Sequence, residues 1–213
     1  GMLMDRMKSR SIYMEEPLRE LCDAVVPEGT FNDLSLPLLV NTVDIERGTQ
    51  IVWGLPGLRD VSVRDAVYAS CALPGFFPPG KVDGRFCVDG GVVDNLPTHI
   101  AALGMDMVIA VDVGSADLAR VPGIAQTGFA SIYMRSATTM MHALQGFPLM
   151  QWNGPPMLLI RPKVGRDWLS FMNSAQNIRE GYRAASCALE DFDTYVDQPG
   201  GVHPSKGVGV WSD

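Results

Sequence analysis

Hydrophobic residues along this chain recur at two different spacings, which predict helices and strands in turn. Between Pro17 and Val25 they recur every three or four residues, the spacing of an amphipathic helix. Residues 37–45 and 48–53 have the composition of two antiparallel strands joined by a short turn. The continuous apolar run at 107–113 is typical of a strand that is buried on both faces of a parallel sheet.

The same criteria predict further elements along the chain. In chain order, they are a helix at 62–73, a strand at 85–88, a helix at 94–103, a helix at 129–144, a strand at 157–160 and a helix at 175–192. Ser62 or Asp60 can cap the first of these helices, and Asp94 or Asn95 can cap the second. This alternation predicts an α/β fold, which we expect to be a layered α/β/α domain with a mainly parallel sheet. Residues 1–196 would form this domain, and residues 197–213, which are rich in Gly and Pro, would form a flexible tail.

Composition narrows the class of protein. Of the 213 residues, 46% are hydrophobic and 19% are charged, which is typical of a globular chain. The net charge of −7, without a basic cluster, excludes nucleic acid as a partner. No run of 18 apolar residues is present, so no membrane-spanning helix is predicted. The four cysteines lack zinc or redox spacing and residues 2–10 do not resemble a signal peptide, which together predict the cytoplasm.

Several common site motifs are absent from the sequence. There is no G-x-G-x-x-G, no P-loop and no H-E-x-x-H. The three histidines, His99, His142 and His203, fall on separate predicted elements. The sequence therefore predicts neither a cofactor nor a metal ion.

The most informative local pattern is Asp89-Gly90-Gly91, which follows the predicted strand at 85–88. Functional residues of α/β folds gather at the carboxyl ends of strands. The two glycines allow a sharp turn and let another group approach the carboxylate closely. Since Asp-Gly is also a common turn pair, these three residues alone favour a simple tight turn.

Segments on either side of this triplet change that balance. Thr42-Val43-Asp44 with Gly48 comes first, residues 69–79 read ASCALPGFFPP, and residues 89–97 read DGGVVDNLP. In this order, over about residues 31–113, the segments resemble the C-terminal half of patatin-like phospholipases, which are serine acyl hydrolases of bacteria and plants. The resemblance implies the patatin-like α/β fold.

The family resemblance also implies a chemistry. In that family, the serine of a G-x-S-x-G turn attacks the acyl carbonyl of a lipid ester. The aspartate of a D-G-[GA] motif orients and activates this serine, and a glycine-rich loop binds the oxyanion. This is ordinary nucleophilic catalysis, in which a weak hydroxyl needs a base and the developing charge needs fixed donors. The resemblance assigns the catalytic aspartate to Asp89 and its turn to Gly90 and Gly91.

One departure from the family pattern is large. The sequence contains no G-x-S-x-G and no glycine-rich loop before its first predicted strand. Ser115 lacks the second glycine, while Ser62 and Ser70 fall in a predicted helix. The family places both motifs N-terminal to this region. We therefore expect a patatin-like protein whose N-terminal part is missing, either by truncation or because a natural relative lost the nucleophile.

These observations predict a lipid acyl ester hydrolase of the Ser–Asp dyad type, with only the aspartate half on this chain and no activity of the chain alone. One alternative is a non-catalytic lipid-binding or regulatory pseudoenzyme. Another is an unrelated α/β binder of small molecules, in which Asp89 is only a turn residue. The expected partner is a lipid or acyl ester, with peripheral membrane contact if lipid is the substrate. An unpaired strand edge also predicts a homo-oligomer.

Overall fold

The computed structural model describes residues 11–113, 121–162, 174–190, 192 and 202–204. The chain divides into two compact units, Gly1–Asn95 and Leu96–Asp213, and each is described by itself. The domain boundary expected at residue 196 stays a prediction. Of the expected tail, only Val202–Pro204 are described, and they form a strand; the rest of the tail lies outside the described residues.

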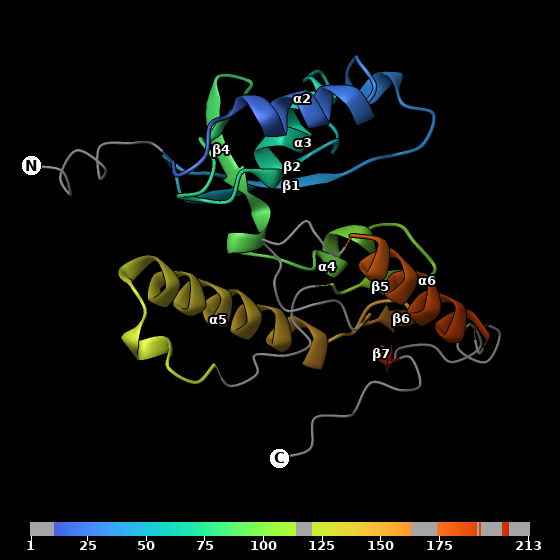
Figure 1. Ribbon diagram of the computed structural model, residues 1–213. Helices are drawn as coiled ribbons and strands as arrows, with labels where there is room; N and C mark the ends of the chain where they lie inside the picture. The colour runs from blue at the N-terminus through green and yellow to red at the C-terminus, as the bar shows by residue number, and fades with distance from the viewer. Residues whose placement is uncertain (1–10, 114–120, 163–173, 191, 193–201, 205–213) are drawn as a thin grey trace, which may run out of the picture. The chain divides into compact units, whose positions relative to one another are not determined.

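The first unit is a four-stranded antiparallel sheet in the order β2-β1-β4-β3. Its elements are α2 (Glu16–Val25), η1 (Phe31–Asp33), β1 (Val40–Asp44), β2 (Thr49–Trp53), α3 (Val63–Cys71), β3 (Gly80–Val82), β4 (Arg85–Asp89) and η2 (Gly90–Val92). Helix α3 packs against β1, β3 and β4, and α2 packs against α3, so that α3 lies between α2 and the sheet (Figure 1).

Local sequence signals account for the ends of these elements. The predicted hairpin is confirmed: β1 and β2 pair antiparallel, with Val40 opposite Trp53 and Asp44 opposite Thr49. The predicted cap of α3 is also confirmed, because the Ser62 hydroxyl accepts the Asp65 N–H at 3.2 Å. This bond satisfies one of the N–H groups that a helix start leaves without a partner.

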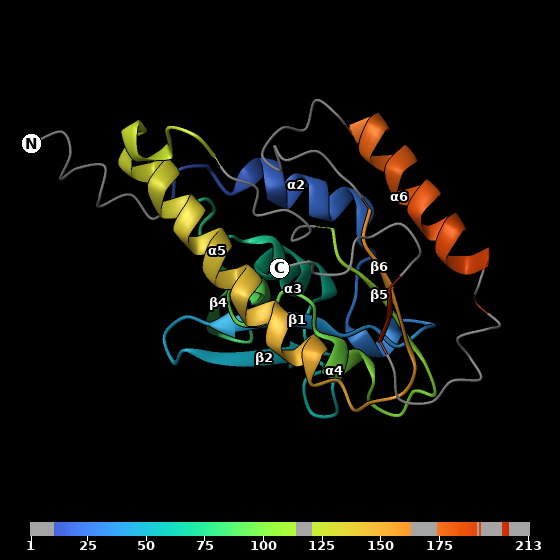
Figure 2. The same cartoon turned by 90° about the horizontal axis from the view of Figure 1, so that it is seen from below.

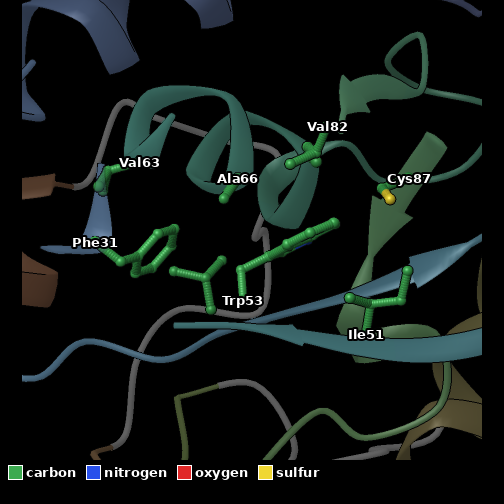
Figure 3. Packing of buried hydrophobic residues seen from close by; sticks show 9 residues of the cluster. Phe31, Ile51, Trp53, Val63, Ala66, Val82 and Cys87 are labelled. Carbon is green, nitrogen blue, oxygen red and sulfur yellow. The ribbon is translucent and has the colours of Figure 1, made fainter. Parts of the chain in front are cut away.

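The core of the first unit forms between the sheet and α3. Trp53 is fully buried at its centre, among Ile51, Ala66, Val82 and Cys87 (Figure 3). Its indole N–H donates to the Thr42 hydroxyl at 2.9 Å, so its polar atom is satisfied inside the core. Packing therefore fixes the inward side chains of β1 and β2. Because a shift of one residue would turn these side chains outward, packing also fixes the register of the two strands.

The second unit contains a three-stranded parallel sheet in the order β5-β6-β7. Its elements are α4 (Thr98–Ala101), β5 (Val108–Val111), η3 (Ile124–Gln126), α5 (Phe129–Met150), β6 (Met157–Ile160), α6 (Ser174–Glu190) and β7 (Val202–Pro204). Strands β5 and β6 lie side by side in Figure 2. The central strand β6 is buried on both faces, since Met157 and Leu159 pack with Trp152 whereas Leu158 and Ile160 pack with Ala188 of α6.

The α/β class is confirmed, but one layered and mainly parallel sheet is not. The described strands form two sheets, and the larger one is antiparallel. Short turns join β1 to β2 and β3 to β4, so each of these pairs is antiparallel, and β4 pairs antiparallel with β1 to complete the sheet. No helix in the described part of the chain is long and apolar enough to cross a membrane.

Two smaller expectations need correction. The run at 107–113 does not form a strand buried on both faces: β5 is an end strand among those described, and Ile109 and Val111 remain 52% and 50% exposed. Helix α4 is not capped by Asp94 or Asn95, because Pro97 occupies the N-cap and no side chain caps it. Proline at a helix start carries no N–H that would need an acceptor.

Candidate functional site

Asp89 is the last residue of β4, at the point where the strand passes into the short helix η2. It lies opposite Thr42 of β1 in the sheet register. Its backbone N–H donates to the carbonyl oxygen of Ala72, just after α3, at 3.1 Å. The backbone of Asp89 is thus held by β1 on one side and by the end of α3 on the other.

The two carboxylate oxygens of Asp89 have different surroundings. Oδ1 accepts the backbone N–H of Gly91 at 2.8 Å and so caps η2. Oδ2 has no hydrogen-bond partner among the described residues. Burial raises the pKa of this carboxyl, and the Gly91 N–H partly opposes the shift by lowering the pKa. One oxygen is therefore anchored by the chain, and the other has no hydrogen-bond donor among the described residues.

The glycine after Asp89 is required by a close backbone contact. A Cβ at position 90 would lie 2.5 Å from Cγ and Nδ2 of Asn41, and 2.6 Å from its carbonyl carbon. Any side chain here would collide with β1. Gly90 and Gly91 are both buried, so the turn lies inside the unit.

Asn41 is a member of this site that sequence reasoning missed. Its Nδ2 donates to the Asp94 carbonyl oxygen at 2.9 Å, and its Oδ1 accepts from Gln50 Nε2 at 2.9 Å. Its own carbonyl oxygen accepts the Ser70 hydroxyl at 2.8 Å. No local pattern could have revealed this, because Asn41 and Asp94 are 53 residues apart. An asparagine in the middle of a strand was the only available signal, since asparagine is depleted there.

The neighbouring hydroxyl and thiol groups are not set up as nucleophiles for Asp89. The Ser70 hydroxyl donates its proton to the Asn41 carbonyl and not to a carboxylate. Burial raises the pKa of the Cys71 thiol to about 11, and the charges of Cys22 and Asp89 add to this. A thiol with such a pKa is almost entirely protonated at neutral pH.

Within the described residues, no group of three or more His, Cys, Asp or Glu side chains is close enough to hold a metal ion. What the arrangement supplies is a single carboxylate, partly shielded from water and fixed by one oxygen. Such a group can accept a proton from an alcohol and hold that alcohol in place.

Comparison with known proteins gives the site a family context. Residues 3–102 match the family model of patatin-like phospholipases. An uncharacterized NTE family protein of Mycobacterium tuberculosis is 30% identical over 112 residues, which is 52% of this chain and 30% of that protein.

Eukaryotic relatives match a shorter stretch. Patatin-like phospholipase domain-containing protein 7 of mouse is 40% identical over 88 residues, or 40% of this chain and 6% of that protein. A lysophospholipase of Aspergillus fumigatus is 43% identical over 72 residues, or 32% of this chain and 5% of that protein. The matched region thus spans under a third of the length of each of these relatives. Residues 3–102 of the chain are thus similar to the patatin-like phospholipase family.

Proposed function

We propose that this chain carries the aspartate half of a Ser–Asp dyad that hydrolyses the acyl esters of lipids. Asp89 would accept the proton of the serine hydroxyl as the hydroxyl attacks the acyl carbonyl, and would return that proton to the leaving alcohol. Gly90 and Gly91 form the turn that presents its carboxylate. The proposed setting is the cytoplasm, with peripheral contact at a lipid surface and no cofactor.

The observation that carries this proposal is the unequal use of the two Asp89 oxygens. The Gly91 N–H fixes the carboxylate through Oδ1, while Oδ2 has no partner among the described residues. A turn aspartate with a purely structural role needs only the first of these features. Burial raises the pKa of Asp89 above the ordinary aspartate value, which makes the group a better base toward an alcohol. The match of residues 3–102 to the patatin-like phospholipase family model supports the lipid substrate class.

The serine of the dyad has to come from outside these 213 residues if the proposal is right. The sequence contains no G-x-S-x-G, and the hydroxyl of nearby Ser70 is engaged by a backbone carbonyl. A carboxylate without its nucleophile cannot transfer an acyl group. The 213-residue polypeptide alone is therefore expected not to hydrolyse p-nitrophenyl esters. Turnover by this polypeptide that disappears in Asp89→Ala would contradict this expectation.

The decisive experiment uses the protein as its gene encodes it. Hydrolysis of a p-nitrophenyl acyl ester and of a lysophospholipid would be measured for the wild type, for Asp89→Asn and for Asp83→Asn. Asp89→Asn is expected to lower kcat about 10²–10⁴-fold, because the general base is lost. Asp83 is exposed and lies in the β3–β4 turn, so Asp83→Asn is a matched control that leaves kcat unchanged. Equal activity of all three proteins would refute the assignment of Asp89.

The absence of G-x-S-x-G from these residues also favours a second candidate, a lipid-binding or regulatory pseudoenzyme. This protein would bind lysophospholipid or phospholipid without hydrolysing it. Reading the coding DNA upstream of these residues separates the two candidates, because an in-frame G-x-S-x-G there favours the hydrolase. Saturable lipid binding by the gene-encoded protein, with no turnover, would favour the pseudoenzyme instead.

A further inference from the structure

Asn41 contacts the turn after Asp89 at both of its ends. At the first end, the Asn41 amide occupies the space beside Gly90: a Cβ on residue 90 would lie 2.5 Å from Cγ and Nδ2 of Asn41. At the far end, its Nδ2 donates to the Asp94 carbonyl oxygen at 2.9 Å. Within the turn, the N–H groups of Val93 and Asp94 both donate to the Gly90 carbonyl oxygen. The Asn41 side chain therefore contacts both ends of a turn, Gly90–Asp94, that is itself held by backbone hydrogen bonds.

Asn41 is itself held from two directions. The amide of Gln50, on β2, donates to its Oδ1 at 2.9 Å, which orients the side chain so that Nδ2 faces Asp94. The hydroxyl of Ser70, on α3, donates to its carbonyl oxygen at 2.8 Å. Asn41 also directly precedes Thr42, the residue opposite Asp89 in the sheet register. Asn41 thus connects the turn to both β2 and α3 through hydrogen bonds.

We propose that Asn41 is the positioning residue of the Asp89 turn: it fixes Gly90–Asp94 so that the Gly91 N–H stays on Oδ1 of Asp89 and the carboxylate keeps one orientation. No hydrogen bond joins the Asn41 side chain to the carboxylate, so Asn41 acts through the turn. Its catalytic meaning rests on the function proposed for Asp89, whereas its effect on the turn does not. The two can therefore fail separately.

The proposal predicts a local change when Asn41 loses its amide. Asn41→Leu keeps nearly the same size and shape but cannot donate to the Asp94 carbonyl. That end of the turn is released, and the Gly91 N–H opens more often to solvent. As the turn loosens, the Asp89 carboxylate gains water and its pKa falls toward the ordinary aspartate value, because burial is the larger of the two causes of its shift.

The test measures the turn directly by NMR on the full 213-residue chain. Hydrogen exchange at the Gly91 amide and the titration of the Asp89 side-chain carboxyl would be followed in wild type, Asn41→Leu and Gln50→Ala. Asn41→Leu is expected to speed Gly91 exchange about tenfold or more and to lower the Asp89 pKa, while the β1 and β4 core amides exchange as in wild type. Gln50→Ala removes only the bond to Oδ1, so both changes should be clearly smaller.

Each outcome decides the proposal. Unchanged Gly91 exchange and an unchanged Asp89 pKa in Asn41→Leu would overturn it. Faster exchange throughout β1 and β4 would also overturn it, because Asn41 would then act as a general stabiliser of the sheet. If the local changes appear, kcat and KM of the gene-encoded protein are measured next for wild type, Asn41→Leu and Asp89→Asn. A lower kcat in both Asn41→Leu and Asp89→Asn supports both proposals. A kcat of Asp89→Asn equal to that of the wild type would refute the dyad and leave the positioning role of Asn41 intact.

Discussion

Asp89 and Asp44 lie on neighbouring strands, yet their carboxyl groups are shifted in opposite directions. Burial raises the pKa of Asp89, against which the Gly91 N–H acts in part. A hydrogen bond from the Arg47 side chain lowers the pKa of Asp44, and the backbone N–H groups of Arg47 and Glu46 contribute in the same direction. The charged form is disfavoured at the candidate site and favoured at the hairpin turn. A group that must take up a proton during a reaction benefits from the first situation.

The raised pKa of Asp89 makes a prediction about stability against pH. Between the ordinary aspartate value and the raised value, the folded chain binds more protons than the unfolded chain, so the free energy of unfolding falls as pH rises through this window. Asp89→Asn cannot ionise and should escape this loss. Thermal unfolding of both proteins from about pH 4 to pH 7 should show a smaller decrease in Tm for the variant. Parallel Tm profiles for the two proteins would contradict a raised pKa.

The glycine at position 90 predicts a second effect of a single residue. Gly90→Ala would place a methyl group 2.6 Å from the Asn41 carbonyl carbon, which is backbone and cannot rotate away. Overpacking of this kind costs about 1–3 kcal/mol of unfolding free energy. Chemical denaturation should show this loss, whereas Gly84→Ala has open space around its Cβ and should lose less, chiefly from its positive φ of 73°. Equal losses at the two glycines would argue against the close contact.

The β1–β2 hairpin shows how one side chain organises a whole element. Asp44 Oδ1 accepts the N–H groups of Glu46 and Arg47 at 3.0 and 3.1 Å, and its Oδ2 pairs with Arg47 Nη1 at 2.7 Å. Gly48, with a φ of 65°, closes the turn by donating its N–H to the Asp44 carbonyl at 2.8 Å. This turn sets the register of β1 against β2, and in that register the Gln50 side chain of β2 reaches Asn41 of β1.

Acid should weaken this hairpin. Since the pKa of Asp44 is lowered in the folded chain, its contribution to stability is present above the ordinary aspartate value and is lost as pH falls through the lowered value. Asp44→Asn should therefore be less stable than wild type near pH 7, and the difference should shrink in strong acid. Tm measured down to about pH 2 checks this. A difference that stayed constant with pH would show that the ion pair with Arg47 is not its source.

Elements with local signals were predictable, and those that depend on distant partners were not. The hairpin, the Ser62 cap and the buried strand β6 are confirmed because each is encoded by neighbouring residues or by one apolar run. Strand β5 was expected to be covered on both faces, but an apolar run alone cannot tell one covered face from two. For the candidate site, the sequence indicated Asp89 and its two glycines through a family pattern but not Asn41, whose partners are remote in sequence.

For the molecule as a whole, the expected homo-oligomer remains a prediction with a physical basis. Strand β5 ends its sheet among the described strands, and its outward residues Ile109 and Val111 are apolar and half-exposed. An apolar end strand favours pairing with another chain. We expect light scattering at increasing concentration to show a dimer or larger species. Val111→Lys should shift it toward monomer, whereas Ile178→Lys, at a 71% exposed position of α6, should not. A monomer at all concentrations would contradict the prediction.

Chain-local information in this protein was enough for its class, for most of its elements and for its similarity to patatin-like phospholipases. Turn residues, helix caps and apolar periods act over a few positions, so they can be read along the chain, and the Asp-Gly-Gly segment with its neighbours identified the patatin-like pattern. Only the tertiary structure decided the antiparallel order of the first sheet and the burial of Asp89. It also decided that one oxygen of Asp89 is hydrogen-bonded while the other is not, and that Gly90 lies against Asn41. These features arise between residues that are remote in sequence, and their energies depend on packing and water exclusion, which no local pattern encodes.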